Sequence, residues 1–219
     1  MFMKPMLPSP CTHPLDDSIY LFEPKLDGHR LILSLIRRKV HMYTSHGFEC
    51  TEQYPELCPV PVDDDVVLDG EVVLYDENGS MDHDALMERF RLTRRAAIRS
   101  EAYFRPVRYL VFDVLYYGGN DLRNEPLSKR KEMLDRILTE NDYYRKVKYA
   151  DGHGRELYSW IRAYRMPGLV AKRKDSVYEA GRSKAWLTIN RPVWGSRDSR
   201  PAEVRPLDEN RPLPRDLCG

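Results

Sequence analysis

The stretch Phe22-Glu23-Pro24-Lys25-Leu26-Asp27-Gly28-His29-Arg30 sets a lysine among apolar neighbours, just before an acid and a glycine. Strand-forming runs flank it at residues 18–22 and 31–36, so we expect Lys25 where a strand ends and a turn begins. We expect Gly28 to take a positive φ in that turn. A partly apolar wall disfavours the ammonium form of a lysine, and its amine can then act as a nucleophile. An exposed Lys-Asp turn explains this stretch alone equally well.

The overall composition is that of a folded and nearly neutral chain. Its 219 residues are 42% hydrophobic, and 35 basic against 34 acidic residues give a formal net charge of +1. Any surface that binds nucleic acid must therefore be local. The four cysteines form no CxxC pair, which argues against a zinc site or a disulfide framework and favours a reducing compartment. No apolar run is long enough to span a membrane and residues 1–10 lack the layout of a signal peptide, so we expect a cytoplasmic protein without a membrane partner.

A second chemical candidate interrupts a strongly apolar strand. The run 66–76 is apolar and β-branched on both sides of Asp69-Gly70-Glu71. A carboxylate inside a buried strand is costly unless it is paired or binds a metal ion. Asp69 and Glu71 share a face at i and i+2, and both are better functional candidates than the acidic run 63–65, which suits a solvated loop.

The remaining chain completes an α+β pattern. Further strands are expected near residues 40–44, 108–117, 169–173 and 184–190, and helices over 82–101 and 126–138 and ending near 158–164. The arginines of the helix over 82–101 are expected on a solvated surface, although they could also meet phosphates. The proline-rich residues 1–14 should be extended.

The last part of the chain differs from the rest in composition. Residues 191–219 hold five prolines and six arginines but few large apolar side chains, which predicts a disordered or extended tail. The expected organisation is therefore one domain over residues 1–190, followed by a tail over residues 191–219.

Four of these segments together resemble the nucleotidyltransferase (adenylation) domain of ATP-dependent DNA ligases of bacterial or phage type. Their superfamily also includes RNA ligases and mRNA capping enzymes. The matching segments are residues 25–30 (the KxDGxR motif), 67–71 (the DGE strand), 109–115 (the aromatic strand) and 168–176, with Tyr178, Gly181 and Trp186 beyond them. The resemblance covers roughly residues 4 to 190. It implies an α+β lysine-nucleotidyltransferase fold (ATP-grasp-like, as in DNA ligase catalytic domains), with antiparallel sheets flanked by helices.

The resemblance also implies an activity. Lys25 would attack ATP to give a lysyl-AMP intermediate, pass AMP to a 5′-phosphate and allow a nick in double-stranded DNA to be sealed. Glu71 would serve the ribose or a Mg²⁺ ion, which offsets charge on the transferred phosphoryl group. Arg30 and Arg182 would contact DNA. Such an enzyme would act in DNA repair, recombination or replication.

The same resemblance implies a nucleotide site. Glu23 would contact the edge of the adenine, and Phe112 would stack on the base, although simple core packing explains Phe112 equally well. Arg30, Glu71 and Lys172 would complete the contacts to the nucleotide.

Several positions depart from the family pattern. Ser45 replaces an arginine, Pro167 replaces a glutamate that serves a metal, and Thr188 and Asn190 replace two lysines that reach the ATP phosphates. Ligases also usually continue into an oligonucleotide-binding (OB) barrel, for which the residues after 190 are too few. We therefore expect no complete OB barrel, and a separate OB-fold domain or a repair partner would have to supply that part. A catalytically degenerate ligase-like module that binds nucleotide or DNA is the main alternative, and an RNA ligase or capping-type nucleotidyltransferase is another.

Overall fold

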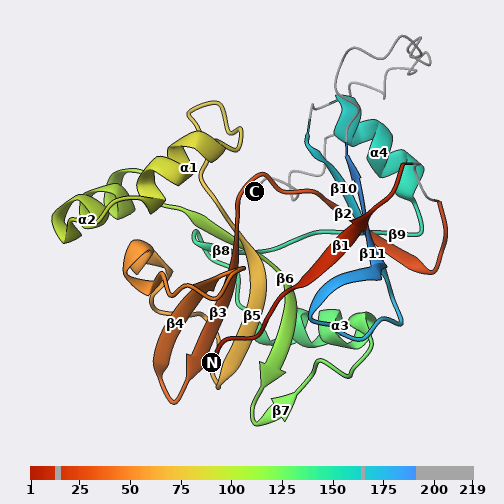
Figure 1. Cartoon of the computed structure of the whole chain (residues 1–219), viewed down its shortest axis with the longest axis horizontal. Coiled ribbons are helices and arrows are strands. Elements are labelled where there is room, and N and C mark those ends of the chain that lie inside the picture. Colours follow the sequence, from red (N-terminus) through yellow and green to blue (C-terminus); the bar gives the residue numbers. More distant parts are fainter. Residues whose placement is uncertain (13–15, 164–165, 191–219) are drawn as a thin grey trace.

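The computed structural model describes residues 1–12, 16–163 and 166–190. The tail predicted over residues 191–219 lies outside the described residues. Two sheets form the frame of the described part, and helices surround them (Figure 1).

Each sheet draws its strands from distant parts of the sequence. The first sheet has the order β1 (Met6–Pro10), β11 (Gly181–Asn190), β10 (Gly168–Arg173), β2 (Tyr20–Pro24) and β9 (Ala150–Asp151). The second has the order β4 (Lys39–Thr44), β3 (His29–Ile36), β5 (Val66–Val73), β6 (Arg108–Tyr117) and β7 (Asn120–Asp121), with β8 (Tyr144–Lys146) also paired to β6. Most pairings are antiparallel, as predicted, but β1 runs parallel to β11 and β8 runs parallel to β6. Neither sheet closes into a barrel within the described residues, which agrees with the predicted α+β fold.

The helices agree with the predicted positions better than with the predicted lengths. They are α1 (His83–Phe90), α2 (Arg95–Phe104), α3 (Leu127–Ile137) and α4 (Gly154–Ala163), and short 3₁₀ turns cover Thr51–Gln53 and Pro55–Leu57. The single helix predicted over 82–101 is wrong, because the backbone leaves the helical conformation at Arg94, directly before α2. The side chain of Asp82 accepts a 2.9 Å hydrogen bond from the Ala85 N–H and caps the start of α1.

Arg89 on α1 corrects the prediction that the helix arginines are solvated. Its side chain is buried, pairs with Glu56 at 2.6 Å and donates a 2.9 Å hydrogen bond to the carbonyl of Arg105. A buried charge requires such partners. Arg89 therefore holds α1 against the chain segment that precedes β5.

The contact between the two sheets is an apolar cluster that both of them supply. Ile32 and Phe112 come from the second sheet, whereas Met6 and Trp186 come from the first. Because successive residues of a strand point to opposite faces, Val111 next to Phe112 packs into a separate cluster on the other side of β6. The alternation along β6 thus turns Phe112 toward the first sheet.

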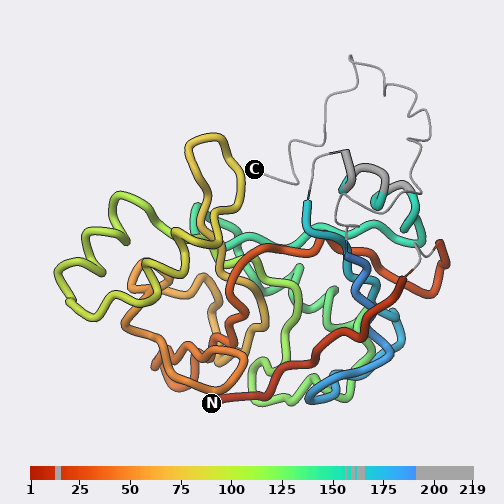
Figure 2. Tube along the Cα trace, turned by 45° about the horizontal axis from the view of Figure 1, so that its top comes forward, coloured from red at the N-terminus to blue at the C-terminus, as the bar shows by residue number. Residues whose placement is uncertain are grey.

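The described part of the proline-rich N-terminal segment, residues 1–12, is extended as predicted, whereas residues 13 and 14 lie outside the described residues. Figure 2 shows it crossing the molecule beside β11, with which β1 pairs. The segment also reaches the second sheet, since the Met6 carbonyl accepts a 3.2 Å hydrogen bond from Nη2 of Arg30. In the described part of the chain, none of the helices is both long and apolar enough to cross a bilayer.

Candidate active site

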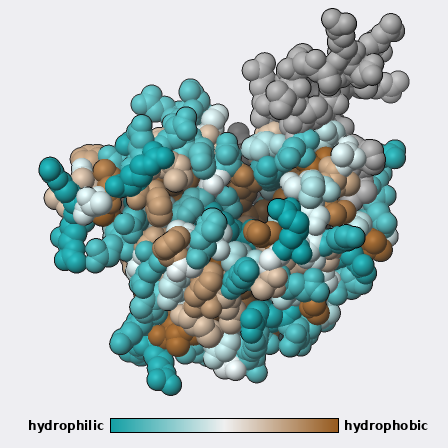
Figure 3. All heavy atoms as spheres, in the orientation of Figure 1, coloured by the Kyte–Doolittle hydropathy of each residue, from teal (hydrophilic) through white to brown (hydrophobic). Residues whose placement is uncertain are grey.

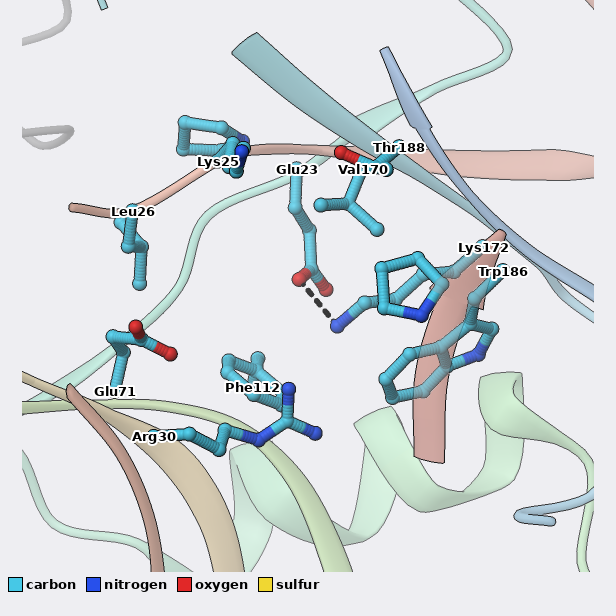
Figure 4. Close-up of a pocket in the computed structure, with 12 residues that line it drawn as sticks. Glu23, Lys25, Leu26, Arg30, Glu71, Phe112, Val170, Lys172, Trp186 and Thr188 are labelled. Carbon is cyan, nitrogen blue, oxygen red and sulfur yellow. Dashed lines mark ion pairs between the residues drawn. The ribbon is translucent and has the colours of Figure 1, made fainter. Parts of the chain in front are cut away.

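A cavity of about 150 Å³ lies where the two sheets meet, and strands of both sheets line it (Figure 4). Hydrophobic side chains border a hollow near the centre of the face shown in Figure 3. The structure brings six of the predicted site residues to the cavity wall: Glu23, Lys25, Arg30, Glu71, Phe112 and Lys172. Arg182 does not line the cavity; its exposed side chain donates a 2.9 Å hydrogen bond to the carbonyl of Pro8.

Lys25 stands directly after the end of β2. Its backbone N–H donates a 2.8 Å hydrogen bond to the carbonyl of Gly168 on β10. Its side-chain Nζ donates a 2.8 Å hydrogen bond to Oδ1 of Asn190, the last residue of β11. The predicted position at a strand end is confirmed, and Lys25 lines the cavity.

The reason for the glycine at position 28 differs from the predicted one. Gly28 does not have a positive φ. A Cβ atom at this position would lie 2.2 Å from the carbonyl oxygen of Val72 and 2.8 Å from Cγ of Glu71. Glycine is therefore required because the Lys25 turn passes directly against β5.

Asp69 meets the expectation that a carboxylate in this strand is paired. Its two oxygens accept hydrogen bonds of 2.5 and 2.6 Å from Nε and Nη2 of Arg30, and the Tyr178 hydroxyl donates a further one of 2.5 Å. Burial alone would lower the pKa of Arg30, but the Asp69 carboxylate outweighs it and the pKa is raised. Arg30 is thus fixed as a cation in the wall of the cavity.

Phe112 packs against cations as well as apolar groups. The Arg30 guanidinium carbon lies 4.4 Å from the ring centre, and Nζ of Lys172 lies 4.0 Å from it. The Trp186 ring meets Phe112 edge-on, with the centroids 6.3 Å apart. The Phe112 ring is buried and also lines the cavity, so it packs in the core and borders the space that a base would occupy.

Glu23 lies between two lysines. Its Oε2 is 2.6 Å from Nζ of Lys172, and its Oε1 is 2.5 Å from Nζ of Lys131 on α3. Burial alone would raise the pKa of the Glu23 carboxyl, but the two ammonium groups lower it below its usual value. Burial lowers the pKa of Lys172 to about 8, although Glu23 opposes this shift. The Lys172 ammonium therefore faces Glu23 and the Phe112 ring rather than solvent.

The sequence does not predict that Lys131 belongs to this cluster. It lies on an amphipathic helix, where a lysine normally extends into solvent. The sequence contains no signal for its burial, because the partner Glu23 is on a distant strand.

Glu71 has the environment of a functional carboxylate. Burial raises its pKa to about 7; Asp69 and Asp27 add to the shift, whereas Arg30 and Lys25 oppose it. A carboxylate that can ionise near neutral pH suits a site in which a cation arrives with the substrate. Among the described residues, no group of three or more His, Cys, Asp or Glu side chains could hold a metal ion.

Three of the departures from the family pattern border the proposed nucleophile. Thr188 lines the cavity, and its buried Oγ1 has no hydrogen-bond partner among the described residues. Asn190 binds Lys25. Pro167 directly precedes β10, whose first residue accepts the backbone hydrogen bond of Lys25.

Comparison with known proteins agrees with this geometry. A family model described as "ATP dependent DNA ligase domain" matches residues 5–189. The chain belongs to the ATP-dependent DNA ligase domain family. This ligase domain is 34% identical over 190 residues to the SPbeta prophage-derived DNA ligase-like protein LigB of Bacillus subtilis, with 86% of the chain and 67% of LigB covered.

The second relative is a much longer protein. The ligase domain is 30% identical over 183 residues to the multifunctional non-homologous end joining protein LigD of Mycolicibacterium smegmatis, with 82% of the chain but only 22% of LigD covered.

A solved structure confirms the fold. The mycobacterial DNA ligase D complexed with ATP and MES matches with a TM-score of 0.70 and 26% identity, over 85% of this chain and 59% of that one. The ligase domain therefore has the α+β fold of ligase catalytic domains, and it spans less than two thirds of that structure.

Proposed function

We propose that this ligase domain carries out the adenylation chemistry of an ATP-dependent DNA ligase. The observation that carries the proposal is the position of Lys25 in the wall of a cavity that Glu23, Glu71 and Phe112 also line. The Lys25 amine would attack the α-phosphorus of ATP, forming a nitrogen–phosphorus bond as pyrophosphate leaves. AMP would then pass to the 5′-phosphate of a nick, and the 3′-hydroxyl would displace AMP to close the strand.

The cavity accommodates the base of the nucleotide in this proposal. Its volume of about 150 Å³ is smaller than the ~300–1,000 Å³ typical of ligand pockets, so the ribose and phosphates extend toward Lys25 at its edge. The Phe112 ring offers an aromatic face to the base, and Glu23 offers a carboxylate acceptor to the base edge. Arg30 contributes a fixed positive charge near the phosphates.

Glu71 is the residue that fits a magnesium ion. Mg²⁺ usually binds proteins through one or two carboxylates together with substrate phosphates. Glu71 is a carboxylate in the cavity wall near Lys25, and it suits an ion that ATP carries into the site. When bound, such an ion offsets charge on the transferred phosphoryl group, while Lys25 supplies the nucleophile.

Nicked double-stranded DNA is the proposed substrate of the later steps. The related proteins carry ligase names, and Arg182 offers an exposed guanidinium on β11 for a phosphate contact. Because the described residues form two open sheets and no barrel, we propose that a separate OB-fold domain or a repair partner helps to hold the nick.

Covalent labelling tests the proposed function. The protein is incubated with magnesium and ATP labelled at the α-phosphate, and in parallel with labelled GTP, and acid-labile label on the protein is measured. We expect label from ATP, none in Lys25→Ala, and unchanged label in Lys184→Ala, a control at an exposed lysine of β11. Label from GTP instead of ATP would favour a capping-type enzyme.

A nucleotide-binding module without catalysis is the second candidate. It is favoured by the hydrogen bond between Lys25 and the neutral Asn190, because lysines stand at positions 188 and 190 in the family pattern. Binding of ATP without any covalent label would support this candidate and exclude the first.

A further inference from the structure

Lys131 does not line the cavity, but it contacts Glu23, which does. Glu23 is a buried acid with two basic partners, Lys131 and Lys172. Lys131, Lys172 and Glu23 expose 3%, 3% and 2% of their surface. Lysines are rarely buried to this extent unless they are paired. Two lysines for one carboxylate leave an excess of positive charge, which a folded protein retains at a cost in desolvation.

The two lysines hold different oxygens of the carboxylate. Lys172 reaches Oε2 from β10 at 2.6 Å, and Lys131 reaches Oε1 from α3 at 2.5 Å. The Lys131 ammonium also lies 5.2 Å from the Tyr149 ring centre, which helps to fix it. With a counter-charge at each oxygen, the Glu23 carboxylate cannot turn without separating one ion pair.

We propose that Lys131 is a positioning residue that sets the base specificity of the cavity. Together with Lys172 it holds Glu23 as an ionised acceptor, so that the cavity selects a purine with an exocyclic amino group over one with an exocyclic carbonyl. The inference rests on the proposed function, because it requires a purine nucleotide to enter the cavity.

The selection follows from the hydrogen-bonding capacity of a carboxylate. An ionised carboxylate only accepts hydrogen bonds, whereas a protonated one can also donate. Burial alone would favour the protonated form of Glu23, which could donate to a carbonyl. An ionised carboxylate has about four acceptor positions over its two oxygens, so Glu23 can accept from an amino group while Lys131 and Lys172 remain paired with it. A ligand with a carbonyl at this position offers no donor and sets its partly negative oxygen against the ionised carboxylate, so the site disfavours it.

Lys131 tests this idea better than Lys172 does. Lys172 itself lines the cavity and touches Phe112 and Trp186, so replacing it would change the shape of the cavity. Lys131 does not line the cavity and meets the base only through Glu23. A change in base preference on replacing Lys131 would therefore report on Glu23.

The experiment compares the binding of ATP and inosine triphosphate (ITP), which carries a carbonyl in place of the amino group. Dissociation constants for both are measured by calorimetry on the full chain with magnesium. We expect the unaltered protein to prefer ATP by roughly tenfold or more, Lys131→Met to lose most of this preference, and Lys131→Arg to retain it. Lys129→Met is the matched control, because Lys129 lies on the same helix but is exposed and pairs with the exposed Glu132. It should leave the preference unchanged.

A second set of variants covers the case in which Lys131→Met does not fold, as judged by circular dichroism. Glu23→Gln and the double variant Glu23→Gln/Lys131→Met leave no unpaired carboxylate beside the cavity. Glu23→Gln alone should lose the preference for ATP, and adding Lys131→Met should change it no further. A preference retained in folded Lys131→Met, or a further change in the double variant, would overturn the inference.

The outcomes also separate this inference from the proposed function. If the unaltered protein binds neither nucleotide, both fail. If it prefers ATP and folded Lys131→Met prefers ATP equally, only the role of Lys131 fails.

Discussion

The Nζ atom of Lys25 donates a 2.8 Å hydrogen bond to Oδ1 of Asn190. The proposed nucleophile is thus tied to the end of β11 by a neutral amide. An amide oxygen orients the amine, but it supplies no positive charge to a phosphate that approaches Lys25. The next residue on the same face of the strand, Thr188, is also uncharged.

Positive charge at positions 188 and 190 of β11 should accelerate the formation of lysyl-AMP. We predict that Thr188→Lys and Asn190→Lys each raise the rate of lysyl-AMP formation by about tenfold or more, since a donor aimed at transition-state charge contributes about 2.7–4 kcal/mol in favourable cases. Single-turnover labelling with α-labelled ATP measures the rate.

The uncharged variants Thr188→Met and Asn190→Met serve as controls for this prediction. They add a side chain of similar length without the charge and should not raise the rate. Equal rates in the lysine and methionine variants would show that charge at these positions does not limit the reaction.

Gly28→Ala should displace the Lys25 turn. Its Cβ would lie 2.2 Å from the Val72 carbonyl oxygen, so either the turn or β5 must move. We expect a loss of about 1–3 kcal/mol in the free energy of unfolding, together with weaker ATP binding, as for other overpacked sites. Urea unfolding and calorimetry measure the two effects.

Gly79→Ala is the comparison for Gly28→Ala. Gly79 has a φ of +77° but open space around its Cβ position, so its substitution reports backbone strain without a clash. The Gly79→Ala variant should bind ATP as well as the unaltered protein does. If Gly28→Ala bound ATP as well as Gly79→Ala does, the close approach to β5 would not matter for the site.

Glu71 should make the stability of the protein depend on pH. Its pKa is raised from 4.5 to about 7, so between these values the folded state keeps a proton that the unfolded state has released. The free energy of unfolding therefore falls as the pH rises through this window, and the loss is complete above pH 7.

Glu71→Gln removes the pH-dependent contribution of the Glu71 carboxyl to the free energy of unfolding. The stability of the variant relative to the unaltered protein should increase between about pH 5 and pH 8, by up to about 3 kcal/mol. Urea unfolding at the two pH values provides the measurement. A stability difference that does not change with pH would mean that Glu71 titrates normally.

Arg130 and Asp113 should contribute strongly to stability. Both are fully buried, and Nε and Nη2 of Arg130 donate hydrogen bonds of 2.8 and 2.9 Å to the Asp113 carboxylate, which joins α3 to β6 next to Phe112. Arg130→Met leaves a buried carboxylate without its partner and should lower the free energy of unfolding by about 3–5 kcal/mol. Arg136→Met, at an exposed position of the same helix, should change it by less than about 0.5 kcal/mol.

The sequence predicts those features that depend on local pattern. The end of a strand at Lys25, the buried strand around Asp69 and the helix beginning after Pro126 all follow from hydrophobic period and turn residues. The requirement for a partner at Asp69 also follows, because a buried carboxylate cannot remain unpaired.

Features that depend on distant neighbours could not be predicted in this way. The identity of the Asp69 partner, the burial of Lys131 and the burial of Arg89 all depend on contacts between separate elements. The positive φ expected at Gly28 fails for the same reason: the constraint comes from β5, which lies far along the chain.

Locating AMP on the protein tests the proposed role of Lys25 directly. After incubation with ATP and magnesium, tandem mass spectrometry of proteolytic peptides identifies the modified residue. We expect AMP on Lys25 and on no other lysine. AMP on a different lysine, or an unmodified Lys25 in protein that demonstrably binds ATP, would contradict it.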